Sequence, residues 1–98
     1  MSVFAVEYVY GAESAAERDV HRPAHREWLN SLVGQGKVLA SGPFVDNAGA
    51  LLLFVAGSES ELSDLLKQDP FATAGVISAV KTTQWNPVIG AFSDYVQK

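Results

Sequence analysis

Cysteine is absent from this chain of 98 residues. Its absence excludes disulfide bonds, thiolate nucleophiles and cysteine-ligated zinc, but it does not identify the cellular compartment. The sequence also lacks a glycine-rich phosphate loop and a GxSxG motif, so nothing in it supports nucleotide hydrolysis or acyl-enzyme chemistry. No stretch is long and apolar enough to span a membrane. Residues 1–10 lack a basic segment and carry Glu7 within an apolar run, unlike a signal peptide, so we expect a cytoplasmic protein.

Charge is also sparse, because charged residues make up 18% of the sequence, and the net charge is −4. An acidic surface repels the phosphates of DNA and RNA, which argues against a nucleic-acid partner. Apolar residues make up 48%, a composition typical of a globular domain. We predict a single domain over residues 1–98, with a core over about 3–87 and a C-terminal tail over 88–98.

Four apolar segments have the composition of β-strands, and they cover residues 3–10, 37–44, 50–56 and 76–85. Alternation within the first segment places Phe4, Val6 and Tyr8 on one face and Glu7 on the other. The continuous apolar run over 50–56 is typical of a central strand that is covered on both faces.

A first helical segment follows the first strand. Ser14 and Glu17 have the spacing of a capping box, which predicts a short helix. Pro23 then favours a break and a fresh start, because proline fits the first turn of a helix better than its interior. After this break, residues at helical spacing predict one buried stripe, formed by Ala24, His25, Trp28, Leu29, Leu32 and Val33.

A second helical segment has a clearer start and end. Ser58 and Glu61 form a capping-box pattern. The helix stops near Asp69, because Pro70 disfavours helical backbone at the residue before it. Its inward stripe is formed by Leu62, Leu65 and Leu66.

The order of these elements predicts an α+β fold of the ferredoxin-like β-α-β-β-α-β type with an antiparallel sheet. Two helices cover only one face of such a sheet, yet the first, third and fourth strands are apolar on both faces. A second copy packed sheet to sheet is the simplest cover, so we expect a homodimer. The alternative is that the apolar tail, which contains Phe92, Tyr95 and Val96, folds back over the open face.

His25 and Asp69 are the strongest candidates for chemistry. A histidine on an apolar stripe suits general acid–base work, and the alternative is a buried histidine whose ring is satisfied by the backbone. Asp69 continues the spacing of Leu66, so an extended helix would point it inward, where it would orient a histidine. The alternative is a cap for a short turn that begins at Pro70.

Other polar and aromatic residues each allow two interpretations. Glu7 is a pocket acid or an edge charge, and Arg22 pairs with a substrate anion or lies in solvent. Trp28 and Trp85 wall an apolar pocket or pack in the core.

His21 and His25 are spaced as a metal-binding pair on one helical face. Pro23 argues against a continuous helix through both, and no third ligand is evident. We therefore expect no metal and no cofactor.

Three short segments resemble the YciI-like (YCII-related) family. Residues 22–25 (RPAH), followed by a helix, resemble the start of that family's first helix. Residues 69–76 (DPFATAGV) resemble its DPYxxAGV segment, which leads into the last strand. Residues 41–43 (SGP) fit the glycine-proline end of its second strand. The resemblance spans nearly the whole chain, from about residue 3 to 87.

The resemblance implies a dimeric α-β barrel related to muconolactone isomerase-like proteins, with a catalytic His–Asp pair that corresponds to His25 and Asp69. Family members with an assigned reaction act on small hydroxylated aromatic compounds, and one is a dehydrochlorinase. Phe71 stands where the family usually has tyrosine, so a hydroxyl that would touch a ligand is missing. The loop after the second strand is short, which changes the rim of the expected pocket.

These observations favour a small-molecule enzyme of the lyase or hydrolase type, with His–Asp acid–base chemistry on a small cyclic or hydroxyaromatic compound. The alternative is a non-catalytic dimeric module that binds a small ligand or a partner protein. We expect the two helices to run roughly parallel, with His25 near the start of one and Asp69 at the end of the other. Contact within one chain or across the dimer therefore stays open. The expected substrate-binding residues are Arg22, Glu7, Phe71 and Trp28.

Overall fold

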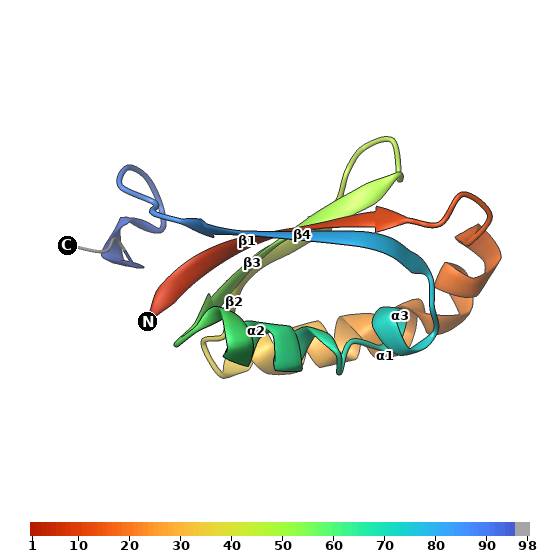
Figure 1. The fold of residues 1–98 in the computed structure, drawn as a ribbon, viewed down its shortest axis with the longest axis horizontal. Coiled ribbons are helices and arrows are strands. Elements are labelled where there is room, and N and C mark those ends of the chain that lie inside the picture. The colour runs from red at the N-terminus through yellow and green to blue at the C-terminus, as the bar shows by residue number, and fades with distance from the viewer. Residues whose placement is uncertain (96–98) are drawn as a thin grey trace.

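The computed structural model describes residues 1–95. Its elements are β1 (Ser2–Tyr10), α1 (Ala15–Gly34), β2 (Val38–Pro43), β3 (Gly49–Ala56), α2 (Glu59–Leu66), α3 (Pro70–Thr73), β4 (Ile77–Trp85) and the 3-10 helix η1 (Ser93–Tyr95). The strands form one sheet in the order β2-β3-β1-β4, and each neighbouring pair is antiparallel. The helices α1, α2 and α3 lie against one face of this sheet (Figure 1). The predicted α+β, ferredoxin-like β-α-β-β-α-β fold is confirmed.

The core lies between the sheet and the helices. Alternate residues of β1 point toward the helices, as the sequence predicts, and the paired residues of β3 continue this surface. Both helices contribute leucines to it. Truncating such a fully buried aliphatic side chain to alanine typically costs about 2–5 kcal/mol. The principal core residues are Phe4, Val6, Tyr8, Leu29, Leu32, Leu52, Phe54, Leu62 and Leu66.

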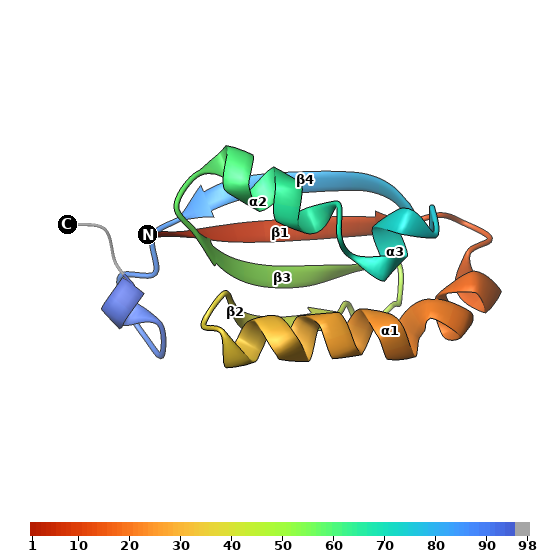
Figure 2. The same cartoon turned by 90° about the horizontal axis from the view of Figure 1, so that it is seen from below.

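The start of α1 differs from the prediction in two ways. The helix runs without interruption through Pro23, so the expected break is wrong. Proline removes one backbone donor and its ring presses on the carbonyl of Asp19, but packing of the later turns holds the helix together. In Figure 2 the first turns of α1 stand off the axis of the rest of the helix.

The expected capping box at Ser14 is also wrong. The Ser14 hydroxyl donates to the carbonyl of Gly11 at 2.7 Å and accepts from Nε of Arg18 at 3.1 Å. It makes no capping bond to the helix backbone, because it is turned toward the preceding loop. Glu17 instead lies 3.5 Å from Nε2 of His21.

The buried stripe of α1 is narrower than predicted. His25, Leu29 and Leu32 are buried, and Trp28 packs against the core. The flanking residues of the predicted stripe, Ala24 and Val33, are exposed. Only side chains in the middle of the stripe are buried against the sheet. Ala24 and Val33 lie at the two edges of the stripe around the helix, where they stay exposed.

The second helical segment agrees with its pattern. The Ser58 hydroxyl accepts from the backbone N–H of Glu61 at 3.1 Å, and a carboxylate oxygen of Glu61 accepts from the N–H of Gly57 at 2.9 Å. The helix α2 ends at Leu66, and after a turn Asp69 is the N-cap of α3.

The helices α1 and α2 run in opposite directions, which corrects the expectation that they run roughly parallel (Figure 2). Each helix returns along the strand before it, and β1 and β3 are antiparallel. The first half of α1 and the end of α2 therefore lie at the same end of the molecule. This arrangement brings the regions of His25 and Asp69 together within one chain.

The outer face of the sheet carries no helix (Figure 1). Val9, Leu51 and Trp85 are 50%, 39% and 42% exposed. β3 lies between β1 and β2, as predicted, and only Leu51 of its residues is exposed. β4 is an edge strand without a buried side chain, and residues 81–84 are polar on both of its faces. The expectation that β4 is apolar on both faces is therefore wrong.

The described part of the tail leaves Val9 and Leu51 of this outer face exposed, whereas Val3 and Val55, which alternation also places on this face near the start of β1, are buried. Residues 88–95 lie beyond the end of the sheet at which β1 begins, in both views (Figure 1, Figure 2). Val96, which belongs to the covering segment of the alternative interpretation, lies outside the described residues. None of the helices within residues 1–95 has the length and apolar character needed to cross a membrane.

Candidate active site around His25 and Asp69

Asp69 is a fully buried carboxylate with three hydrogen-bond partners. Its Oδ1 accepts from the backbone N–H of Phe71 at 2.9 Å and lies 2.7 Å from Nδ1 of His25. Its Oδ2 accepts from the Tyr8 hydroxyl at 2.8 Å. Asp69 therefore caps α3, as one interpretation predicts, and it also contacts the histidine, although α2 ends at Leu66 and does not extend to it. A buried charge is tolerated only when it is satisfied in this way.

The contact with Asp69 fixes the proton positions on His25. An ionised carboxylate only accepts hydrogen bonds, so Nδ1 of the imidazole carries the proton in this pair. The other ring nitrogen, Nε2, has no protein partner among residues 1–95. In the tautomer with a protonated Nδ1, this nitrogen is a hydrogen-bond acceptor. The imidazole is 7% exposed and comes from the buried stripe of α1.

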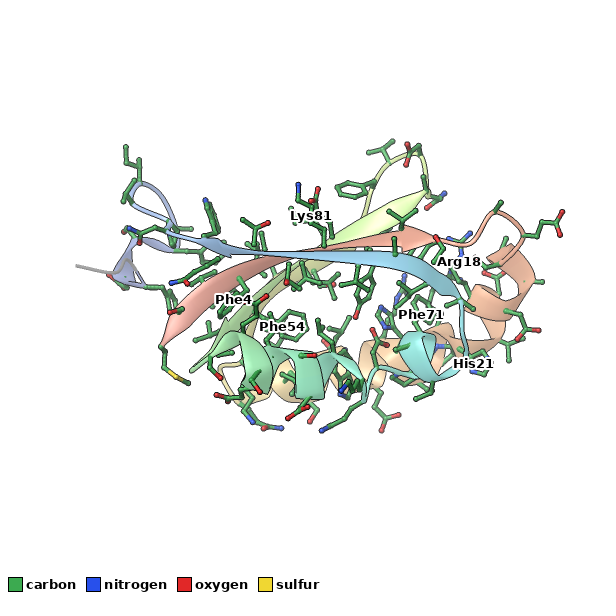
Figure 3. All side chains as sticks on the ribbon, viewed as in Figure 1. Phe4, Arg18, His21, Phe54, Phe71 and Lys81 are labelled. Carbon is green, nitrogen blue, oxygen red and sulfur yellow. The ribbon has the colours of Figure 1, made fainter. Side chains whose placement is uncertain are left out.

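Aromatic rings hold the imidazole in place. The ring of Phe71 lies parallel to that of His25, with centroids 3.9 Å apart and an interplanar angle of 4°. Tyr10 meets Phe71 edge to face at 5.9 Å, and the guanidinium of Arg18 lies 4.3 Å above the Tyr10 ring. Phe71 therefore packs flat against the imidazole of His25 and also lines the cavity beside it. Figure 3 shows Arg18 and Phe71 at the same end of the molecule, between α1 and the sheet.

A cavity of about 630 Å³ opens beside His25, between α1 and the strand β2. Its size suits one small molecule, since ligand sites in proteins span roughly 300–1,000 Å³. Its lining combines apolar side chains from α1, β2 and α3 with polar groups from α1, β2 and the β2–β3 loop. The lining includes Tyr10, Arg18, Arg22, His25, Arg26, Leu29, Asn30, Val33, Val38, Ser41, Pro43, Asn47 and Phe71.

The predicted site residues separate into two groups. Arg22 and Phe71 line the cavity with His25. Glu7 lies on the outer face of the sheet, opposite Lys81 in register, so it does not contribute to this cavity. Trp28 packs against the core with its ring centroid 6.2 Å from that of Phe54, and it does not line the cavity.

The histidine pair at His21 and His25 does not converge on a common point. His21 pairs with Glu17 on the exposed side of α1, and His25 is engaged with Asp69. Figure 3 shows His21 on the side of α1 away from the sheet. Within residues 1–95 no group of three histidine, aspartate or glutamate side chains is placed to hold a metal ion.

Tyr8 is the member of the site that the sequence did not reveal as functional. Its place on the inward face was predicted, but alternation alone cannot distinguish a tyrosine that donates to a buried acid from one that only packs. Burial raises the pKa of the Tyr8 phenol, and the neighbouring Asp69 carboxylate raises it further. The phenol therefore stays protonated and remains a donor to Asp69 at neutral pH.

The YCII-related domain family matches residues 3–86 of this chain. A curated relative from Emericella nidulans, called derivative of benzaldehyde biosynthesis cluster protein C, is 32% identical over 84 residues. That alignment covers 74% of this chain and 86% of the relative.

Two solved structures are similar in fold. One is 5-chloro-2-hydroxyhydroquinone dehydrochlorinase from Burkholderia phenoliruptrix AC1100, in complex with 2,5-dihydroxybenzoquinone. It has a TM-score of 0.77 and 25% identity, over 86% of this chain and 93% of that one. The other is an antibiotic biosynthesis monooxygenase, with a TM-score of 0.55 and 14% identity, over 88% of this chain and 97% of that one. The second likeness concerns the fold alone. The resemblance in the sequence motifs is thus confirmed, and the chain belongs to the YCII-related domain family.

Proposed function

We propose that this protein is a small-molecule enzyme in which His25 is the general acid–base and Asp69 positions it. The observation that carries the proposal is the buried contact of 2.7 Å between Nδ1 of His25 and Oδ1 of Asp69, at the wall of a cavity. Asp69 presents the imidazole in one tautomer and stabilises the imidazolium that forms when Nε2 accepts a proton. The arrangement resembles the base and its orienting acid in a triad, without a protein nucleophile.

The proposed substrate is a small cyclic or hydroxyaromatic compound. The dehydrochlorinase with the same fold acts on a chlorinated hydroxyhydroquinone, according to its name, and the Emericella relative is named for a benzaldehyde biosynthesis cluster. The cavity here combines an aromatic wall with hydrogen-bonding groups, as a hydroxylated ring requires.

The proposed chemistry is of the lyase type. Nε2 of His25 accepts the proton of a ring hydroxyl, and the electron pair of that O–H bond forms a C=O bond. The displaced π pair takes up a proton at the ring carbon that bears the leaving group, and this carbon becomes tetrahedral. When a second ring hydroxyl then loses its proton, its electron pair forms a second C=O bond, and the shifted π pair expels the substituent as an anion. The imidazolium returns its proton to solvent or to the product. No redox partner is needed, since the ring loses a proton and an anion together.

Turnover of hydroxylated aromatic and quinone compounds tests this proposal. Wild-type protein, His25→Ala and Asp69→Asn are compared by ultraviolet absorbance and by release of the anion. We expect His25→Ala to lower kcat by about 10²–10⁴-fold while circular dichroism shows a retained fold. If His25→Ala turned over a genuine substrate at the wild-type rate, the acid–base role would be wrong. Tight ligand binding without any turnover would favour the non-catalytic module.

We also propose a homodimer through the outer face of the sheet. The support is the apolar surface at Val9, Leu51 and Trp85, which no element among residues 1–95 covers. Glu7 and Lys81 lie opposite one another in this face, so opposite charges are adjacent when it is buried. Sedimentation of the wild type is expected to give a dimer mass and Leu51→Lys a monomer mass. A wild-type monomer mass at every concentration would contradict this proposal.

A further inference from the structure

All three arginines of the chain line the same cavity as His25. They are Arg18, Arg22 and Arg26, spaced four residues apart, so they follow one face of α1. No aspartate or glutamate contributes to the described lining. This concentration of positive charge contrasts with the net charge of −4 of the whole chain. A cleft lined by one sign of charge attracts ligands of the opposite sign.

From this arrangement we infer that the cavity is a site for a small organic anion, namely a ring compound that carries a carboxylate or an ionised hydroxyl group. The inference rests on the proposed function for the chemistry at His25, and it adds the charge class of the substrate. Arg22 and Arg26 are the anion-binding side chains, and Arg18 is a fixed part of the wall.

The three guanidiniums differ in how they are held. Arg18 donates to the Ser14 hydroxyl at 3.1 Å and to the carbonyl of Asn47 at 3.2 Å, and it stacks on Tyr10. These contacts use part of its donors and fix its position. Its charge therefore contributes a constant positive field, and it does not need to move to a ligand.

Arg22 and Arg26 are available to a ligand. Arg22 pairs with Asp19 at the exposed surface of α1, and such exposed pairs contribute little to stability. Arg26 forms no hydrogen bond or ion pair with the described residues. A guanidinium binds a carboxylate with two parallel hydrogen bonds, which gives orientation as well as affinity, and it donates charge-assisted hydrogen bonds to the single oxygen of a phenolate. Displacing Asp19 from Arg22 is therefore a small cost for a ligand anion.

The apolar wall selects a ring over a simple inorganic anion. Leu29, Val38, Pro43 and Phe71 line the cavity together with the arginines. A ligand that contacts both the apolar side chains and the arginines has an apolar body and an anionic group. When the ring lies against Phe71 and its anion contacts Arg26, the guanidinium also stabilises negative charge that forms on a ring oxygen during proton transfer to His25.

Binding of 2-hydroxybenzoate and of its neutral amide, 2-hydroxybenzamide, tests the inference by calorimetry. We expect the anion to bind at least about tenfold more tightly than the amide, as charge-assisted hydrogen bonds require. Arg26→Gln should weaken binding of the anion by about tenfold and leave the affinity for the amide unchanged. Rising salt should weaken binding of the anion only. The matched control is Lys67→Gln, which removes one positive charge from the exposed end of α2, where Lys67 lies 3.8 Å from Asp64. This control should leave both affinities within about twofold.

Three results would overturn the inference. They are equal affinities for anion and amide, an equal loss in Arg26→Gln and Lys67→Gln, and inorganic phosphate that binds as tightly as 2-hydroxybenzoate. The proposed function fails separately. Arginine-dependent binding without any His25-dependent turnover would contradict the proposed enzymatic function and would still support the anion site. His25-dependent turnover of a neutral substrate, with a KM that is unchanged in Arg26→Gln, would support the proposed function and contradict the anion site.

Discussion

The Tyr8 hydroxyl donates a hydrogen bond of 2.8 Å to Oδ2 of Asp69, from a residue 61 positions earlier in the chain. The other oxygen of the same carboxylate contacts His25. Tyr8 makes no hydrogen bond to His25 itself and acts on the proposed base only by holding Asp69, so Tyr8 is a positioning residue. It links the central strand β1 to the helix layer, so the orientation of the imidazole depends on the core of the fold.

Tyr8→Phe should loosen Asp69 without removing the base. We expect kcat to fall by about tenfold with little change in KM, because the substrate-binding wall is untouched while the tautomer of His25 is less firmly held. Nitrogen chemical shifts of the His25 ring should show a mixture of tautomers in place of the single form with protonated Nδ1. A purely structural role would lower stability and leave these ring signals and the kcat of the folded fraction unchanged.

The raised pKa of Tyr8 predicts how stability changes at alkaline pH. Its usual value is 10.0, and burial holds the folded value above it. The folded state therefore keeps a proton that the unfolded state loses, and the contribution of this group is fully present below pH about 10 and declines as pH rises further. The unfolding free energy of the wild type should fall above pH 10 by up to about 1.4 kcal/mol per pH unit more steeply than that of Tyr8→Phe. Urea unfolding at several pH values measures both slopes, and parallel slopes would falsify the assignment.

Asp69→Asn should be harmful to both fold and site. The amide keeps the volume, but its NH₂ group cannot accept, so one of the donors from Tyr8, His25 or the Phe71 backbone loses its partner. Leaving a buried donor unsatisfied costs about 1–3 kcal/mol. The variant should also reverse the tautomer of His25 when its NH₂ faces Nδ1, and turnover should fall with it. Asp64→Asn is the matched control, because Asp64 is exposed on α2. An Asp69→Asn protein with wild-type stability and turnover would contradict both roles of this carboxylate.

Phe71 lies at the position of the usual family tyrosine, and its stacking on His25 explains what the phenylalanine still provides. Phe71→Leu should cost about 0.5–1.5 kcal/mol for the lost aromatic pair, in addition to the loss from imperfect packing. Phe71→Tyr should keep the stack. If Phe71→Leu lowered kcat no more than Phe71→Tyr, after correction for the folded fraction, the orienting role of the ring would be wrong.

The sequence predicted the elements well where local chemistry and tertiary packing agree. Alternation in β1, the capping box at Ser58 and the Asp69–Pro70 boundary each describe a local preference that the fold retains. The sequence failed at Pro23, where the buried stripe of α1 overrides a local breaker, and at Ser14, whose hydroxyl is taken by a loop carbonyl.

The sequence identified His25 and Asp69 as candidates, but it did not predict that they contact each other within one chain. His25 and Asp69 were identified from their position on apolar stripes and from the family motifs. Their contact depends on the relative direction of α1 and α2, which follows from strand pairing and not from either segment alone. Glu7 was misplaced for a simpler reason, since alternation gives the two faces of a strand but does not say which one faces a cavity.

Pro23 and Pro70 provide a matched pair for the last prediction. Pro23 lies inside α1, where it leaves the carbonyl of Asp19 without its usual donor. Pro70 lies in the first turn of α3, where its fixed backbone angle is favourable. Pro23→Ala should therefore raise the unfolding free energy by about 1–2 kcal/mol, because the gain of a helix hydrogen bond exceeds the added entropy of the unfolded chain.

Pro70→Ala should lower the unfolding free energy by about 0.4–1 kcal/mol, because no clash is relieved and the unfolded chain gains freedom. Urea denaturation of both variants at one temperature compares the two signs directly. Equal destabilisation by both would mean that the bend at Pro23 is required by contacts of the first turns of α1. Those turns carry Arg18 and Arg22 to the cavity, so binding of an aromatic anion to Pro23→Ala would then show whether the bend serves the site.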